Sequence, residues 1–163
     1  MRHVISCLVE NQFGVLARIA GMFSSRGFNI DSLAVGETTD PTISRVTIVT
    51  HGDDFIIEQI IKQLRKLIDV IRVQDLTSES HLERELVLAK VSCNRETRGE
   101  IMQIASIFRA RIVDVGTESV VIEMVGDLER IDAFIALLDP FGILEIARTG
   151  SIGLSRGAQA LKV

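Results

Sequence analysis

The sequence predicts an α+β fold made of two tandem ferredoxin-like βαββαβ domains. Segments rich in β-branched residues alternate with segments of helical periodicity in the order βαββαβ, which is the ferredoxin-like arrangement. The same order occurs twice along the 163 residues. Residues 77–83 (TSESHLE) separate the two series, are polar and lack apolar periodicity, as expected of a linker.

The first series covers residues 1–76. Residues 3–10 (HVISCLVE) are rich in β-branched and apolar residues and predict a buried strand. Apolar residues then recur at helical spacing from Val15 to Phe23, and Gly27 stands where a helix commonly ends. The remaining elements are two strands over 29–37 and 43–51, a helix that follows Asp53 and contains Ile56 to Ile68, and a closing strand over 70–76.

The second series covers residues 84–163. The predicted strands are 84–93, 111–116, 118–125 and 142–149, and the predicted helices are 98–108 and 128–138. Thr97 and Glu100 have the spacing of a capping box. The two series also match in residues, since VTIVTHGD (46–53) corresponds to VVIEMVGD (120–127). The last residues, from Gly150 onward, read as a flexible tail.

Each half has about 75 residues, which is near the lower limit for burying a core alone. A domain of this size gains stability by pairing its sheet with a second copy. We therefore expect a homodimer.

Composition excludes several classes of protein. The net charge is −4, neither half has a surplus of Lys and Arg, and Trp and Tyr are absent, so a nucleic-acid partner is not expected. No apolar run reaches about 18 residues, and the N-terminus does not resemble a signal peptide. Cys7 and Cys93 lie in predicted strands without partners at metal spacing. We expect a cytoplasmic protein with two reduced, packed thiols and no membrane segment.

No pattern in the sequence predicts catalysis or metal binding. The histidines, His3, His51 and His81, share no spacing with a carboxylate or cysteine that suggests a metal site or a nucleophile–base pair, and we expect them at the surface or at strand ends. The glycine-rich segment 150–157 lacks the lysine of a phosphate-binding loop. No catalytic residue and no cofactor are assigned to this chain.

The loop between the first strand and the first helix is the candidate binding site. The first N–H groups of a helix have no internal acceptor and carry partial positive charge, so a carboxylate can dock there. Gly14 lets a ligand approach the backbone, and Asn11 offers an amide that donates and accepts. Val15 and Leu16 would meet an apolar ligand side chain. The alternative is structural, in that Asn11 caps a turn and Gly14 permits it.

Several motifs resemble the ACT domain of acetohydroxyacid synthase small subunits, and the resemblance runs nearly the full length of the chain. In the first half they are Asn11–Arg18 (NQFGVLAR), Phe23–Leu33 (FSSRGFNIDSL), Ser44–Ile48 (SRVTI), Glu58–Leu64 (EQIIKQL) and Val73–Thr77 (VQDLT). In the second half they are Arg84–Val91 (RELVLAKV) and Gly153–Gly157 (GLSRG).

The resemblance implies that the chain is a regulatory subunit whose first domain is an ACT domain. Such subunits activate a separate thiamine-diphosphate enzyme, which also carries Mg²⁺ and FAD, and confer feedback inhibition by valine or a related branched-chain amino acid. The effector binds between two ACT domains of a dimer. One chain supplies Asn11, Gly14, Val15 and Leu16, and the other supplies Asn29 and Ile30.

Two alternatives belong to other classes of protein. An acylphosphatase-like hydrolase shares the βαββαβ order and uses an arginine and an asparagine beside a phosphate-binding loop, but Arg18 is predicted inside the first helix. A ligand-sensing domain of another amino-acid-responsive regulator, such as a transcription factor, would need a DNA-reading element, and no basic arm or helix-turn-helix pattern is present.

Overall fold

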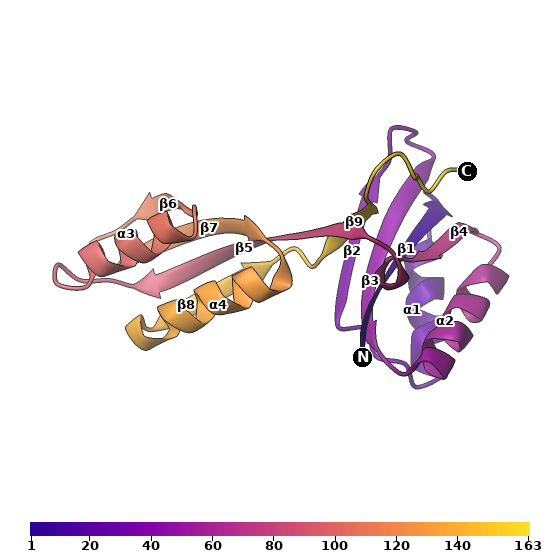
Figure 1. Cartoon of the computed structure of the whole chain (residues 1–163), viewed down its shortest axis with the longest axis horizontal. Coiled ribbons are helices and arrows are strands. Elements are labelled where there is room, and N and C mark those ends of the chain that lie inside the picture. The colour runs from indigo at the N-terminus through magenta and orange to yellow at the C-terminus, as the bar shows by residue number, and fades with distance from the viewer. The chain divides into compact units, whose positions relative to one another are not determined.

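A computed structural model describes all 163 residues, which form two compact units (Figure 1). The first unit comprises residues 1–82 together with 151–163, and the second comprises residues 83–150. The first unit is therefore assembled from both ends of the chain.

The first unit has a four-stranded antiparallel sheet with strand order β2-β3-β1-β4 and two helices against one face (Figure 1). This is the predicted ferredoxin-like arrangement. The elements are β1 (Arg2–Glu10), α1 (Val15–Ser25), β2 (Ser32–Glu37), β3 (Ile43–His51), α2 (Asp54–Lys66), β4 (Val70–Asp75) and the 3-10 helix η1 (Leu76–Ser78).

Local sequence explains where the two helices of the first unit begin and end. Gly27 has a φ of 70°, and beyond it the Phe28 N–H donates to the Phe23 carbonyl (2.9 Å), which ends α1 as predicted. The Asp53 carboxylate accepts the Ile56 N–H (2.9 Å) and caps α2. The helices and the sheet share a mainly aliphatic core that also contains Phe23, against which Phe28 packs. Its fully buried members include Ile5, Cys7, Ile19, Phe23, Ile48, Ile60 and Leu64.

The first sheet is also covered on the face away from the helices. Neighbouring residues of a strand point to opposite faces, so Val4 faces away from the core that contains Ile5. Val4 and Val49 form a small buried cluster with Leu76 of η1. Gly153 packs against this cluster, since a Cβ at Gly153 would lie 2.8 Å from Leu76 Cδ1. The end of the chain thus helps to cover β1.

The second unit repeats the arrangement with a sheet of order β6-β7-β5-β8, and α3 and α4 lie on one side of it (Figure 1). The elements are β5 (His81–Ser92), α3 (Arg98–Ile107), β6 (Arg111–Val115), β7 (Ser119–Gly126), α4 (Leu128–Leu138), the 3-10 helix η2 (Asp139–Phe141) and β8 (Ile143–Arg148). Buried aliphatic side chains of β5 and β7 form the core with Phe134 of α4.

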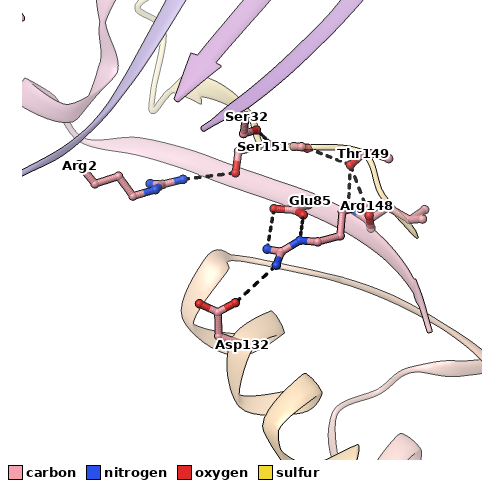
Figure 2. Close-up of polar contacts among 9 residues, drawn as sticks. Arg2, Ser32, Glu85, Asp132, Arg148, Thr149 and Ser151 are labelled. Atoms are coloured by element: carbon pink, nitrogen blue, oxygen red, sulfur yellow. Dashed lines mark hydrogen bonds and ion pairs between the residues drawn. The ribbon is translucent and has the colours of Figure 1, made fainter. Parts of the chain in front are cut away.

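An ion pair inside the second unit fastens β8 to β5 and α4. Arg148 donates to both oxygens of Glu85, a carboxylate with only 5% of its side chain exposed, and its Nη1 lies 3.7 Å from Asp132 (Figure 2). The hydrogen bonds to Glu85 raise the pKa of Arg148, with burial opposing the shift. The pair leaves the Glu85 charge compensated where water cannot reach it.

Three predicted boundaries and caps differ from the structure. The second strand was expected from residue 29 but β2 begins at Ser32, because the ladder with β3 starts at the Ser32–Val49 pair. The expected linker 77–83 contains the end of η1 and the start of β5, because Asp75 caps the 3-10 turn through the Thr77 N–H (2.9 Å). The expected capping box at Thr97 is absent, since Asn94 accepts the Thr97 N–H instead.

The expected flexible tail contains a strand. Residues Ile152–Ser155 form β9, which pairs with β5. The Ser151 N–H donates to Ser32 Oγ (3.0 Å), and Ser151 Oγ accepts from Arg2 (Figure 2). Further along, Ser155 Oγ accepts from Gln74 (3.0 Å). Polarity and glycine content suggested flexibility, but the partners of these residues are supplied by distant parts of the chain.

No helix of the chain has the length and apolar character needed to cross a bilayer. The two cysteines are unpaired and buried, as predicted. Burial raises the pKa of Cys7 to about 12, with the charge of Arg45 acting in the opposite direction.

Replacement of Gly153 by alanine is expected to destabilise the first unit. The new methyl group would lie 2.8 Å from Leu76 Cδ1 and 3.3 Å from the Leu82 carbonyl. Overpacking of this kind costs about 1–3 kcal/mol. The matched control is Gly36→Ala, because a Cβ there meets nothing within 4 Å. Chemical denaturation of both variants and the wild type measures the effect, and equal stabilities for the two variants would contradict the packing of the tail.

The Cys7 thiol is expected to react slowly in the native protein. Its pKa of about 12, against a usual value of 9.0, lowers the thiolate fraction at pH 8 about a thousandfold. A Cys93→Ala variant isolates Cys7, and its reaction with Ellman's reagent is compared with and without denaturant. The Cys7 thiol ionises at a lower pH in the unfolded chain than in the native protein. The free energy of unfolding therefore falls as the pH rises from about 9 to about 12. Equal native and denatured reaction rates would show that Cys7 is not buried.

Candidate functional site

The junction between β1 and α1 is fastened on both sides. The Glu10 N–H donates to the Asp69 carbonyl (2.9 Å), and the Asn11 N–H donates to the Thr42 carbonyl (2.8 Å). These bonds join the end of β1 to the segment before β4 and to the turn before β3. The backbone at the start of the following loop is therefore held in place by hydrogen bonds.

The start of α1 leaves several backbone donors without an acceptor. Gly14 precedes the helix with a φ of 84°, a left-handed conformation that favours glycine, and it has no side chain to cap the helix. Within the chain the N–H groups of Phe13, Gly14, Leu16 and Ala17 have no hydrogen-bond acceptor. Open donors at the positive end of a helix form a receptor for an anion.

The other three α-helices begin beside a side-chain acceptor. Asp53 accepts the Ile56 N–H on α2, and Asp127 accepts the Arg130 N–H on α4, each at 2.9 Å. Ahead of α3, Asn94 Oδ1 accepts the N–H groups of Glu96 (2.8 Å) and Thr97 (2.9 Å). Asn94 thus caps the loop before α3, whereas no side chain caps the loop before α1. The first-turn N–H groups of Gly99 and Glu100 in α3 lack an acceptor, as those of Leu16 and Ala17 do in α1.

Asn11 is held so that its carbonyl oxygen remains available. Its Nδ2 donates to Glu37 Oε1 (3.1 Å) and to the Pro41 carbonyl (2.9 Å). The turn it contacts is itself ordered, because Thr42 donates its N–H and hydroxyl to Asp40, which lowers the pKa of that carboxyl. Oδ1 of Asn11 has no partner in the chain and can accept from an ammonium group.

Asn29 and Ile30 lie at the other end of the sheet. They precede β2, whose first residue Ser32 pairs with Val49, and Val49 pairs with Val4 near the start of β1. Asn11 follows the end of β1, so the two groups are separated by about 20 Å along the strands. Within one chain the predicted site residues are not brought together.

Asn29 presents the same chemistry as Asn11. Its Nδ2 donates to Asp31 Oδ1, while its backbone carbonyl accepts the Thr50 hydroxyl (2.7 Å). The amide oxygen has no partner and the side chain is exposed. Ile30 is half-buried against the core of the first unit.

The apolar residues of the loop differ in exposure. Val15 is buried in the core with 5% exposed, whereas Leu16 is 45% exposed and the Phe13 side chain is fully exposed. Leu16 and Phe13 therefore supply the accessible apolar surface beside the open donors. Phe13 was not singled out from the sequence, although its position in the loop was a signal.

Two further residues of the junction were missed. Arg18 Nε donates to Asp69 Oδ2 (2.6 Å), and its Nη2 forms an ion pair with the same oxygen (2.6 Å). The sequence placed Arg18 inside the helix, as observed, but its side chain folds back toward Gly14. No sequence signal connects Arg18 with Asp69, which lies 51 residues away.

The histidines lie outside this junction, each at or next to a strand end as predicted. His3, the second residue of β1, is buried, with 5% exposed, and its Nδ1 contacts Asp75 (3.2 Å). The His3 side chain lies on the same face of the sheet as that of Asp75, because Asp75 pairs with Ile5, two residues further along β1. His51 contacts Asp31 at the same end of the sheet.

Replacement of Asn11 by alanine is expected to destabilise the first unit slightly, because Asn11 also fastens the turn at Pro41. Two exposed hydrogen bonds are lost, which corresponds to about 1 kcal/mol. Gln12→Ala is the control, since the Gln12 side chain has no hydrogen bond in the chain. A thermal melt compares the variants, and an unchanged melting temperature for Asn11→Ala would mean that these bonds do not contribute.

Comparisons with known proteins agree over the whole chain. Residues 84–157 match the family model described as the small subunit of acetolactate synthase, and residues 5–72 match the model for the ACT domain of such small subunits. A probable acetolactate synthase small subunit of Archaeoglobus fulgidus is 54% identical over 96% of this chain and 98% of its own length. The small subunit from Aquifex aeolicus is 49% identical over 95% of this chain and 81% of its own.

A solved structure has the same fold. The crystal structure of an acetolactate synthase small subunit from Thermotoga maritima superposes with a TM-score of 0.88 at 42% sequence identity, covering 96% of this chain and 98% of that one.

Proposed function

Because the chain belongs to the family of acetolactate synthase small subunits, we propose that it activates a separate catalytic subunit and makes it sensitive to valine. The catalytic large subunit would carry the thiamine diphosphate, Mg²⁺ and FAD, and this chain would carry no cofactor. The chain would act in the cytoplasm, in branched-chain amino acid biosynthesis. Membership of this family favours a regulatory subunit over the two alternatives, an acylphosphatase-like hydrolase and a ligand-sensing domain of another regulator.

The observation that carries the proposal is the open start of α1. Unpaired N–H groups at Leu16 and Ala17 suit the carboxylate of an α-amino acid. The free amide oxygen of Asn11 suits its ammonium group. The exposed Leu16 side chain suits a small aliphatic side chain such as the isopropyl group of valine. A zwitterionic amino acid therefore finds a complement for each of its three parts.

We further propose that the site is completed by a second copy of the chain. Asn29 has a free amide oxygen but lies about 20 Å along the strands from Asn11 in the same chain. In a homodimer, Asn29 and Ile30 of one copy would meet Asn11, Gly14 and Leu16 of the other. Val15 would support the loop from the core below. Valine would then bridge two subunits and favour one arrangement of the dimer.

The proposed regulation requires only a modest affinity for the effector and a modest coupling free energy. An effector that works at metabolite concentrations needs micromolar to millimolar affinity, or about −4 to −8 kcal/mol. The coupling to the catalytic subunit needs only about 1–3 kcal/mol.

Gly14→Asp is expected to abolish the valine response while the subunit still folds and activates the catalytic subunit. The carboxylate would repel the effector, and the φ of 84° would cost about 1 kcal/mol for a residue other than glycine. Calorimetric titration with valine, leucine and isoleucine should show saturable binding to the wild type and at least a hundredfold weaker binding to the variant.

The matched control is Gly157→Asp, because Gly157 also has a positive φ (74°) and a Cβ there meets nothing within 4 Å. This control should bind valine as the wild type does. Retained valine inhibition in Gly14→Asp would refute the site, and failure of the wild-type subunit to activate the large subunit would refute the function.

A further inference from the structure

We propose that Arg18 binds the carboxylate of the effector and that Asp69 positions Arg18 to do so. The inference rests on the proposed function, because it concerns the same site. It adds a side chain to the carboxylate end of the site, which was otherwise composed of backbone donors, and it defines the ligand class as amino acids with a free α-carboxylate.

The guanidinium of Arg18 lies over Gly14. Arg18 is one turn into α1, where its N–H donates to the Gly14 carbonyl (3.0 Å). The side chain turns back toward the start of the helix, and its Nη1 lies 3.1 Å from the position that a Cβ on Gly14 would take. Glycine at position 14 thus allows both the left-handed turn and the approach of a cation to the open donors.

Asp69 fixes the guanidinium on one edge and leaves the rest free. Nε donates to Asp69 Oδ2 (2.6 Å) and Nη2 forms an ion pair with the same oxygen (2.6 Å), whereas Nη1 has no partner in the chain. The Asp69 side chain is 8% exposed and that of Arg18 is 48% exposed. The Asp69 carbonyl accepts the Glu10 N–H, so the anchor is part of the joint that ends β1. Arg18 is therefore oriented before any ligand arrives.

The chemistry of the free edge matches a carboxylate. A guanidinium makes charge-assisted hydrogen bonds to carboxylates, and an oriented one loses little conformational freedom on binding. Leu16 and Ala17 offer their backbone donors beside it. One carboxylate oxygen can accept from these donors and the other from Arg18 Nη1.

The second unit contains an internal contrast. Arg98 also lies at the start of the helix that follows the first strand of its unit, but its Nη2 donates to the carbonyls of Gly116 (2.9 Å) and Thr117 (3.4 Å). The loop donors there are taken by Asn94. In the second unit the loop N–H groups of Glu96 and Thr97 and the Nη2 of Arg98 therefore have acceptors within the protein, although the Gly99 and Glu100 N–H groups stay open. In the first unit the loop has no side-chain acceptor, and Arg18 is held by a carboxylate and not by backbone carbonyls.

The test is a double-mutant cycle between protein and ligand, measured calorimetrically on the full chain. Valine and valinamide are titrated into the wild type, Arg18→Lys, and the double variant Arg18→Gln with Asp69→Asn, which avoids a buried carboxylate without a partner. Valine binding should weaken about tenfold to a hundredfold in the double variant, the range expected for one charged hydrogen bond. The preference for valine over valinamide should fall by a similar factor, and Arg18→Lys should retain part of it.

Each result decides between the two proposals. If the wild type does not bind valine, the proposed function fails and this inference fails with it. If the wild type binds valine and the double variant has the same valine-to-valinamide preference, Arg18 is not a carboxylate ligand and the proposed function stands. If the double variant does not fold, NMR of the wild-type Arg18 guanidinium decides. A shift caused by valine and not by valinamide supports the contact, and unchanged resonances overturn it.

Discussion

The first unit depends on β1 being buried on both faces. All seven residues from His3 to Val9 are buried, although β1 is paired with β3 on one side and β4 on the other and has helices on one face only. At Val4 the second face is covered by Leu76 of η1 and by the returning tail at Gly153. The equivalent strand β5 alternates, with Val87 buried and Leu88 37% exposed.

The two units differ in the loop that precedes the first helix, which a side chain caps in the second unit and no side chain caps in the first. In both, a central strand leads through a short loop to the first helix, and an arginine stands near the start of that helix. In the second unit Asn94 and nearby carbonyls take up the donors of the loop and the arginine. In the first unit Gly14 removes the capping side chain, and Asn11 turns its amide toward the neighbouring turn. The donors left open are those that a carboxylate requires.

The antiparallel register of the first sheet decides where the proposed effector can bind. It places Asn11 and Asn29 at opposite ends of the same sheet, so a ligand that contacts both must lie between two chains. Each amide is already oriented by bonds from its NH₂ group, which leaves the two carbonyl oxygens free. In the proposed dimer, the free energy of effector binding would act on the arrangement of two subunits, which is what a regulatory subunit has to change.

The sequence by itself determined the two βαββαβ series, the helix ends at Gly27 and Asp53, and the Asn11–Leu16 junction, because these depend on periodicity and on residues near one another in the chain. The observed starts of β2 and β5 and the capping of α3 differ from the prediction, because each depends on the strand or side chain that supplies the hydrogen-bond partner. Only the tertiary structure decided that β9 belongs with the first unit and that Arg18 is joined to Asp69. Those contacts link residues far apart in the chain, and their energies come from burial and pairing that no local pattern records.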